Sequence, residues 1–433
     1  MSRLVMILAF LALALLAFTL PAAADTTAIV GGKVHTVGPM GTIENATVLI
    51  VDGRIAAVGA DVEVPAGATT IDATGKIVTP GLFSPFGHLG LVEVGYSAGP
   101  LDYSQRGTQF TAGFDVADAY NARSTLIPIN RIEGVTRAVV APTPGYPDES
   151  GSGHILAGLA AIVNLGDEDV LDQRGAAMVV ALGEFGSMLS GGTRTAAWLT
   201  LRNALDEAID YREHKDDFER GMRRDYVHSV NDLEALQGVV NGNTPMIVSI
   251  DRASDIEVLI DFVDEYSVTA IIIGGSEAWM LADELAAASI AIIVGPSANL
   301  PASFDDINAR FGNASILVNA GVKVAIADSD SQTHNARNMT QSAGIAVAHG
   351  LDWDAALRAI TLTPAEIFGV SATTGSIEAG KAADVVIWPG DPLELTNYPE
   401  AVFINGDAVP MVSRQTLLRD RYLQSDKPPA YRD

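Results

Sequence analysis

Four carboxylates at the ends of predicted β-strands are the side chains of this sequence best suited to chemistry. Asp251 and Asp328 directly follow apolar runs, whereas Glu184 and Glu277 follow short segments that contain glycine. Carboxylate oxygens are preferred ligands of hard divalent cations, so these four side chains could hold a metal ion weakly. The alternative is that they are solvated or paired with arginines such as Arg252, as is common in an acidic chain.

The composition excludes several other kinds of site. The chain has no cysteine, which rules out disulfides, thiolate zinc sites and cysteine nucleophiles. Of its 433 residues, 48% are apolar, which is enough for a large buried core. Lys and Arg number 27 against 53 Asp and Glu, a formal net charge of −26. Such a chain repels phosphate backbones and anionic membrane surfaces, so neither is an expected partner, and we interpret the acidity as a means to solubility.

The first 24 residues have the pattern of a secretory signal peptide. Arg3 supplies a positive charge, Leu4 to Leu20 is almost entirely apolar, and Ala22-Ala23-Ala24 offers a cleavage site of small residues. An uncleaved membrane anchor is the alternative, because the apolar run approaches the length that crosses a bilayer. Cleavage after Ala24 would leave a protein without a membrane segment, and its lack of cysteine suits a periplasmic or secreted location.

Short strands with tight turns are predicted at both ends of the mature chain. Asp52-Gly53 lies between two apolar runs, as does Asn405-Gly406, and such dipeptides favour two-residue hairpins. Two all-β segments at opposite ends of a chain most simply pair into one small sheet domain. Between them, from about residue 81 to 369, apolar strands alternate with amphipathic helices, which indicates a parallel sheet. A (β/α)8 barrel fits this length, and a doubly wound sheet is the second choice.

Distinctive motifs lie at the two junctions between these parts. The sequence GKIVTPGL stands at 75–82, and GSIEAGKAAD stands at 375–384, followed by Gly390-Asp391-Pro392-Leu393. These motifs resemble those of the amidohydrolase superfamily, in particular its imidazolonepropionase-like branch. The first is similar to that family's entry into the first barrel strand, and the second is similar to its return to the sheet domain. The resemblance implies an α/β fold: a TIM barrel of the metal-dependent hydrolase type with a composite β-sandwich. The expected division is a signal peptide (1–24), a β-sandwich (25–82 with 370–412), a barrel (83–369) and a C-terminal tail (413–433).

The resemblance also implies a metal site at the carboxyl ends of the barrel strands. Members of this family typically hydrolyse C–N or related bonds with one or two divalent metals, for which zinc is the expectation here. Their ligands are His-x-His on strand 1, a carboxylated Lys or a Glu on strand 4, one His each on strands 5 and 6, and an Asp on strand 8 that also acts as general base.

Only part of this set is present. His88 survives from the strand 1 motif, whereas Phe86 occupies the first histidine position. Ser249 and Gly274 stand where the histidines of strands 5 and 6 are expected. Asp328 matches the strand 8 aspartate, and the resemblance assigns it, with His88, to catalysis. Glu184 could replace the lysine of strand 4, because no lysine lies there.

The candidate metal ligands are therefore His88, Glu184, Asp251 and Asp328, and the sequence also leaves open that no metal is bound. A catalytic zinc normally has three protein ligands, mostly nitrogen, which this set does not supply in the family's geometry. His88 and Asp328 could instead persist only as hydrogen-bonded interior groups of the barrel.

Two functions remain compatible with these residues. The first is an exported hydrolase that acts on C–N bonds of a small molecule, such as a cyclic or other non-peptide amide, through an altered or weakened metal site. The second is a catalytically inactive subunit or binding protein of the same fold, paired with an intact paralogue. The sequence leaves open whether the protein forms a homo-oligomer or a hetero-oligomer with such a paralogue.

Overall fold

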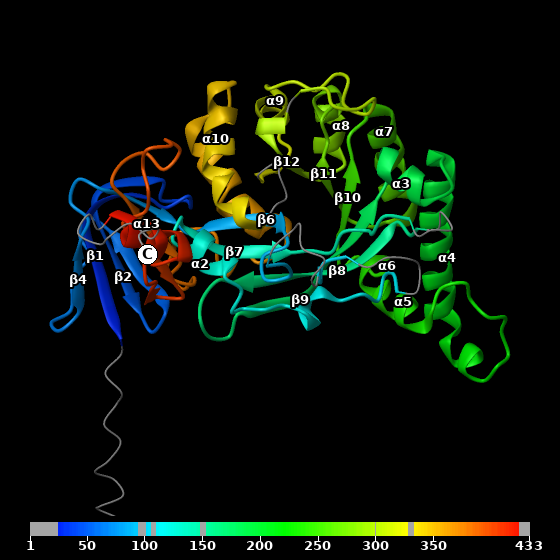
Figure 1. Ribbon diagram of the computed structural model, residues 1–433, viewed down its shortest axis with the longest axis horizontal. Helices are drawn as coiled ribbons and strands as arrows, with labels where there is room; N and C mark the ends of the chain where they lie inside the picture. Colours follow the sequence, from blue (N-terminus) through cyan, green and yellow to red (C-terminus); the bar gives the residue numbers. More distant parts are fainter. Residues whose placement is uncertain are drawn as a thin grey trace, which may run out of the picture.

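The computed structural model describes residues 25–93, 101–104, 110–147, 153–298, 300–327 and 333–423. The predicted signal peptide and Asp328 lie outside the described residues. The described chain forms two eight-stranded sheets, and Figure 1 shows the first at the blue end of the molecule and the second in its cyan to yellow part. Within the described ranges, no helix is both long and apolar enough to cross a bilayer.

The first sheet joins the two ends of the chain. Its strands are β1 (Thr26–His35), β2 (Thr42–Val51), β3 (Arg54–Gly59), β4 (Thr69–Asp72), β5 (Ile77–Pro80), β14 (Val385–Trp388), β15 (Ala401–Ile404) and β16 (Asp407–Ala408). They follow the order β16-β15-β14-β5-β1-β2-β3, and β4 pairs with β1. The antiparallel pair of β14 and β5 places Ile387 opposite Val78 and so connects the two ends. The predicted composite β-domain is thus present.

Both predicted hairpin turns are confirmed, and they touch each other. Asp52 and Gly53 have φ angles of 48° and 77°, and Asn405 and Gly406 have 49° and 86°. These positive values are the reason for the Asx-Gly sequences, because few other residues adopt them without strain. A Cβ atom added at Gly53 would lie 2.6 Å from the carbonyl oxygen of Asn405, so glycine also permits the close approach of the two turns.

The second sheet forms the barrel. Its strands are β6 (Leu82–Gly87), β7 (Val135–Val140), β8 (Leu156–Asn164), β9 (Leu171–Ala181), β10 (Met246–Ile250), β11 (Ala270–Gly274), β12 (Ala291–Val294) and β13 (Val324–Ile326). They follow one another in chain order from β6 to β13. No ladder between β13 and β6 is seen in the described part of the chain, so the barrel is nearly closed. The N–H of Phe83 in β6 instead donates to the carbonyl of Ile360, at 2.9 Å.

The predicted fold class is confirmed, but the sheet is not parallel throughout. Strand β8 runs antiparallel to both β7 and β9, whereas the other described pairs of the barrel are parallel. The connection from β8 to β9 is the short segment 165–170, which holds no helix. A parallel pair needs a long crossover, so this short connection forces the chain to reverse.

Side chains of the barrel strands are buried on both faces, as expected for a sheet covered by helices. Inward-facing residues such as Val139, Val179 and Ile247 form the interior cluster, whereas their neighbours Val140, Val180 and Val248 pack in the larger outer core. This packing fills the barrel and leaves the carboxyl ends of the strands to form a site.

Helices cover the barrel and flank the composite sheet (Figure 1). The α-helices are α2 (Leu126–Arg131), α3 (Gly183–Leu189), α4 (Arg194–Glu219), α5 (Val230–Ala235), α6 (Gln237–Val240), α7 (Ala253–Tyr266), α8 (Ala282–Ala287), α9 (Asn313–Asn319), α10 (Met339–Ala348), α11 (Trp353–Ala359), α12 (Leu362–Ile367) and α13 (Arg414–Leu423). Single 3-10 turns are η1 (Val116–Asp118), η2 (Ala278–Leu281), η3 (Pro296–Ala298) and η4 (Thr333–Asn338). Helix α7 buries Ile256, Leu259 and Phe262, which confirms its predicted amphipathic pattern.

Candidate functional site

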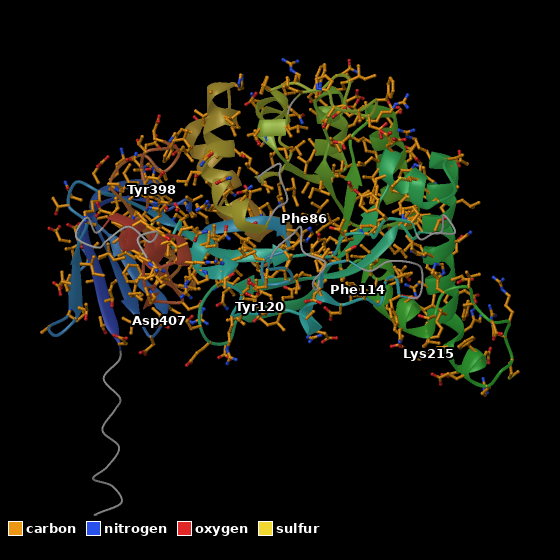
Figure 2. All side chains as sticks on the ribbon, in the orientation of Figure 1. Phe86, Phe114, Tyr120, Lys215, Tyr398 and Asp407 are labelled. Carbon is orange, nitrogen blue, oxygen red and sulfur yellow. The ribbon has the colours of Figure 1, made fainter. Side chains whose placement is uncertain are left out.

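A cavity of about 550 Å³ lies at the carboxyl ends of the barrel strands. Its walls come from the ends of β6, β9, β10, β11 and β12 and from the segments that follow β7, β12 and β13. Active sites of TIM barrels occupy this face, because the loops that follow the strands converge there. Figure 2 shows Phe86 near the middle of the barrel, between α10 and β10.

The three positions at which the resemblance expects histidine ligands all line this cavity. They are Phe86, Ser249 and Gly274, and they come from three different strands. The aromatic ring of Phe86 offers no metal ligand, and it meets the ring of His88 edge-on at a centroid distance of 6.0 Å. The sequence assigned these three residues to the ends of barrel strands, and the structure places them there.

Asp251 is the one predicted ligand that lines the cavity among the described residues. Its Oδ1 accepts hydrogen bonds from the Ser276 hydroxyl at 2.8 Å and from the Ser276 N–H at 3.1 Å. Burial raises the pKa of Asp251, and the nearby carboxylates of Asp306 and Asp305 add to this effect, while the bonds from Ser276 oppose it. Asp251 therefore favours its protonated, neutral form more than an exposed aspartate does.

Gly274 leaves the space that the Asp251 carboxylate occupies. A Cβ atom at this position would lie 2.7 Å from Oδ1 of Asp251, and the φ angle of Gly274 is +101°. A side chain here would both strain the backbone and displace the carboxylate. The glycine at this position and the placement of Asp251 are thus coupled.

His88 is buried behind the cavity wall. Its Nδ1 lies 2.9 Å from the carbonyl oxygen of Ala141, which can only accept, so Nδ1 carries the proton. Its Nε2 then accepts from the hydroxyl of Thr143 at 3.3 Å, and Thr143 lines the cavity. The ring stacks on Tyr103 at a centroid distance of 4.0 Å. Burial lowers the pKa of His88 to about 4, so the ring is neutral at pH 7 and positions Thr143.

The other predicted carboxylates do not join this arrangement. The side chain of Glu184 is exposed, and the backbone N–H of Glu184 donates to Oδ2 of Asp305 at 2.8 Å. Glu277 is buried and fully engaged, because it accepts from the N–H of Ala253 and from the N–H and side-chain amide of Asn308. Asp328 lies outside the described residues, although Ala327, which precedes it, lines the cavity.

The described residues therefore do not assemble the predicted set of metal ligands. Nowhere in the described ranges do three or more His, Asp or Glu side chains come close enough to share one metal ion. His88 is turned to Ala141 and Thr143, Glu184 faces solvent, and Asp251 is held by Ser276. A catalytic zinc needs about three protein ligands, so the donors seen here do not fit one.

Sequence reasoning missed a second carboxylate of the cavity, Asp306. Its Oδ1 accepts from the N–H of Ser303 at 2.6 Å and its Oδ2 from the N–H of Ala302 at 3.1 Å. Burial alone would raise the pKa of Asp306, but these bonds outweigh burial and lower it. Asp306 lies in the loop after β12, where no periodic pattern marks a residue as part of a site.

Comparison with known proteins finds a family model and relatives that match parts of the chain. A model of the Amidohydrolase family matches residues 204–411. Amidohydrolase tasK of Hapsidospora irregularis is 24% identical over 381 residues, which cover 80% of this chain and 38% of tasK. Imidazolonepropionase of Mycolicibacterium smegmatis is 38% identical over 76 residues, which cover 18% of this chain and 19% of that enzyme. The chain thus matches less than two fifths of the length of either relative.

Solved structures show the same fold. An amidohydrolase from Thermotoga maritima superposes with a TM-score of 0.78 at 24% identity, covering 88% of this chain and 99% of the other. Molinate hydrolase superposes with a TM-score of 0.54 at 19% identity, covering 90% and 95% of the two chains. The chain thus has the fold of these hydrolases, and a little under half of it matches the model of the Amidohydrolase family.

Proposed function

We propose that this protein is an exported hydrolase that cleaves a C–N bond of a small molecule in the cavity at the carboxyl ends of the barrel strands. The observation that carries the proposal is the position of Asp251, a half-buried carboxylate with a raised pKa that lines this cavity at the carboxyl ends of the barrel strands. The match to the Amidohydrolase family supports a hydrolytic reaction, and the cavity volume of about 550 Å³ suits a small substrate.

The two carboxylates of the cavity suit general acid–base catalysis. The raised pKa of Asp251 makes it the better proton donor of the two, and the lowered pKa of Asp306 favours its ionised form as the proton acceptor. Environments that move two pKa values apart divide the roles of acid and base in many hydrolases. Hydrolysis of an amide needs both: a base takes a proton from the attacking water, and an acid gives one to the departing nitrogen. Asp328, the family's general base, remains a proposed participant because it follows the cavity residue Ala327.

The hydroxyl groups of the cavity would orient the substrate. Ser249, Ser276 and Thr143 line it, and His88 holds the Thr143 hydroxyl as a donor toward its own Nε2. In the family, a divalent metal activates the attacking water and polarises the carbonyl. The donors described in this cavity do not fit such a metal, so the proposed reaction depends on the carboxylates and hydroxyls of the chain itself.

A second candidate function is favoured by one observation. Phe86, Ser249 and Gly274 line the same cavity, and each stands where the resemblance expects an imidazole ligand. Loss of three ligands together is what a binding protein or inactive subunit that has kept the fold would show. In that case the cavity would still hold a small molecule, and an intact paralogue would supply catalysis.

Hydrolysis of a panel of neutral amides and lactams by the purified protein tests the first proposal. We expect turnover by the wild type and a loss of most activity in Asp251→Asn, which keeps the shape of the side chain but cannot exchange a proton. Glu184→Gln is the matched control, since it removes a carboxylate that is exposed and outside the cavity. Absence of hydrolysis by the wild type would reject the enzymatic proposal in favour of the second candidate, whereas equal activity of the two variants would reject the catalytic role of Asp251.

The proposed export has its own test. Expression of the full chain in a Gram-negative host should release a periplasmic protein whose mass corresponds to a start at Asp25. A protein that keeps residues 1–24 and fractionates with membranes would support the anchor instead.

A further inference from the structure

We infer that the cavity selects molecules with an apolar body and a head group that offers N–H donors, neutral or cationic, and that it rejects carboxylates. This inference rests on the proposed function only in taking the cavity as the substrate site. Three independent features of the cavity lead to it.

The first feature is the charge of the lining. Asp251 and Asp306 contribute to it, and no Lys, Arg or His side chain does so among the described residues. Two arginines of the surrounding elements are engaged elsewhere: Arg194 pairs with Asp255 at 2.8 Å and with Asp305, and the Arg310 guanidinium lies 4.8 Å from the ring centre of Trp279. An anionic head group would therefore meet carboxylate oxygens without a compensating cation, and like charges at close range repel.

The second feature is an acceptor without a donor. Asn313 lines the cavity at the start of α9, and only 3% of its surface is exposed. Its Nδ2 donates to the carbonyl of Gly275 at 2.9 Å, which fixes the orientation of the amide. Its Oδ1 is buried and has no hydrogen-bond partner in the described structure. Buried polar atoms are normally paired, so a ligand N–H, directly or through a water, would complete this group.

The third feature is the apolar wall. Phe86, Phe185, Ile273 and Ile293 line the cavity, and Leu300 lines it while 68% of its own surface is exposed. Tyr146 is 75% exposed and packs edge-on against Phe185, with ring centres 5.8 Å apart. Apolar side chains left exposed beside a cavity are covered when an apolar ligand binds. These apolar side chains would contact a hydrocarbon or aromatic body. The acceptor oxygens of Asp251, Asp306 and Asn313 would receive the donor group.

A matched set of three probes tests this assignment by binding, independently of turnover. Phenylethylamine, phenylacetamide and phenylacetate share one ring and differ in the charge and donors of the head group. In isothermal titration calorimetry at pH 7, we expect the amine and the amide to bind at least about tenfold more tightly than the carboxylate, since like charges across a contact oppose binding. Ethylamine, which lacks the ring, should bind more weakly than phenylethylamine.

Charge-neutralising variants separate the cavity from the overall acidity of the chain. Asp306→Asn should reduce the preference for phenylethylamine over phenylacetate several-fold, whereas Glu184→Gln, which changes the net charge equally, should leave it unaltered. Equal or tighter binding of phenylacetate, the same response in both variants, or no detectable binding of any probe at millimolar concentration would each overturn the inference. Probe binding as expected without amide hydrolysis would reject only the proposed enzymatic function, and hydrolysis confined to anionic amides would reject only this inference.

Discussion

Replacement of Arg137 by methionine should destabilise the whole molecule, because this arginine connects the barrel to the composite sheet. It lies in β7, and only 8% of its side chain is exposed. Its Nε donates to Asp384 at 2.6 Å, its Nη1 pairs with Asp172, and its Nη2 donates to Asn405 at 2.7 Å. Asp384 and Asn405 belong to the C-terminal part of the composite sheet, so one guanidinium holds groups from both sheets.

The expected loss in the free energy of unfolding follows from the burial of the ion pair. The side chain of Asp384 is only 4% exposed, so Arg137→Met would leave a carboxylate in the interior without its cation. Removing one partner of a buried ion pair costs about 3–5 kcal/mol, because the desolvated charge that remains is uncompensated. The Thr374 hydroxyl and the Asn405 N–H still donate to Asp384, which favours the lower part of that range.

Urea unfolding followed by tryptophan fluorescence measures this loss, since Trp388 lies in β14 and is buried. The double variant Arg137→Met, Asp384→Asn should recover part of the stability, because it also removes the unpaired charge. Arg220→Met is the control: its pair with Asp217 is exposed, and such pairs contribute only about 0–1 kcal/mol. If Arg137→Met unfolds at the same urea concentration as Arg220→Met, the inferred coupling between the sheets is incorrect.

Two further predictions concern the cavity and its wall. His88 is neutral and buried with a pKa of about 4 in the folded protein, below its ordinary value of 6.5, so folding loses stability as the pH falls from about 6.5 toward 4. The free energy of unfolding should fall by about 3 kcal/mol less between pH 7 and pH 4 in His88→Gln than in the wild type. The same fall in both proteins would contradict a buried neutral ring. Gly274→Ala should destabilise the protein by about 1–3 kcal/mol and displace Asp251, because its backbone has a positive φ and its Cβ would meet the carboxylate. Gly321→Ala has a similar φ of +94° but open space around the new Cβ, so equal midpoints of thermal unfolding for the two variants would show that the contact with Asp251 is unimportant.

The composite sheet and the barrel could be predicted because their signals are local. Asx-Gly dipeptides determine hairpin turns through backbone conformation, and the regular spacing of Ile256, Leu259 and Phe262 determines the buried face of α7. Strand β8 was not predicted, and its direction was therefore missed. Its sequence, LAGLAAIVN, is a short apolar run with three Ala and one Gly, and it has no period that separates a strand from a helix.

The candidate site could be predicted only in part. The framing motifs placed Phe86, Ser249 and Gly274 at strand ends, and all three line one cavity. Glu184 follows a strand in the same way, yet its side chain faces solvent. Position at a strand end does not determine the direction in which a side chain points, because that depends on the turn that follows the strand.

The sequence by itself determined that the chain alternates strands and helices between two β-rich ends, that it lacks cysteine, and that three expected imidazole ligands are missing. Those are properties of residue type and order, which need no folded chain. Only the tertiary structure decided that His88 turns to Ala141 and Thr143, that Asp306 joins Asp251 in the cavity wall, and that Oδ1 of Asn313 is left without a donor. These properties arise where segments distant in sequence meet, because burial and hydrogen bonding depend on neighbours that only the fold brings together.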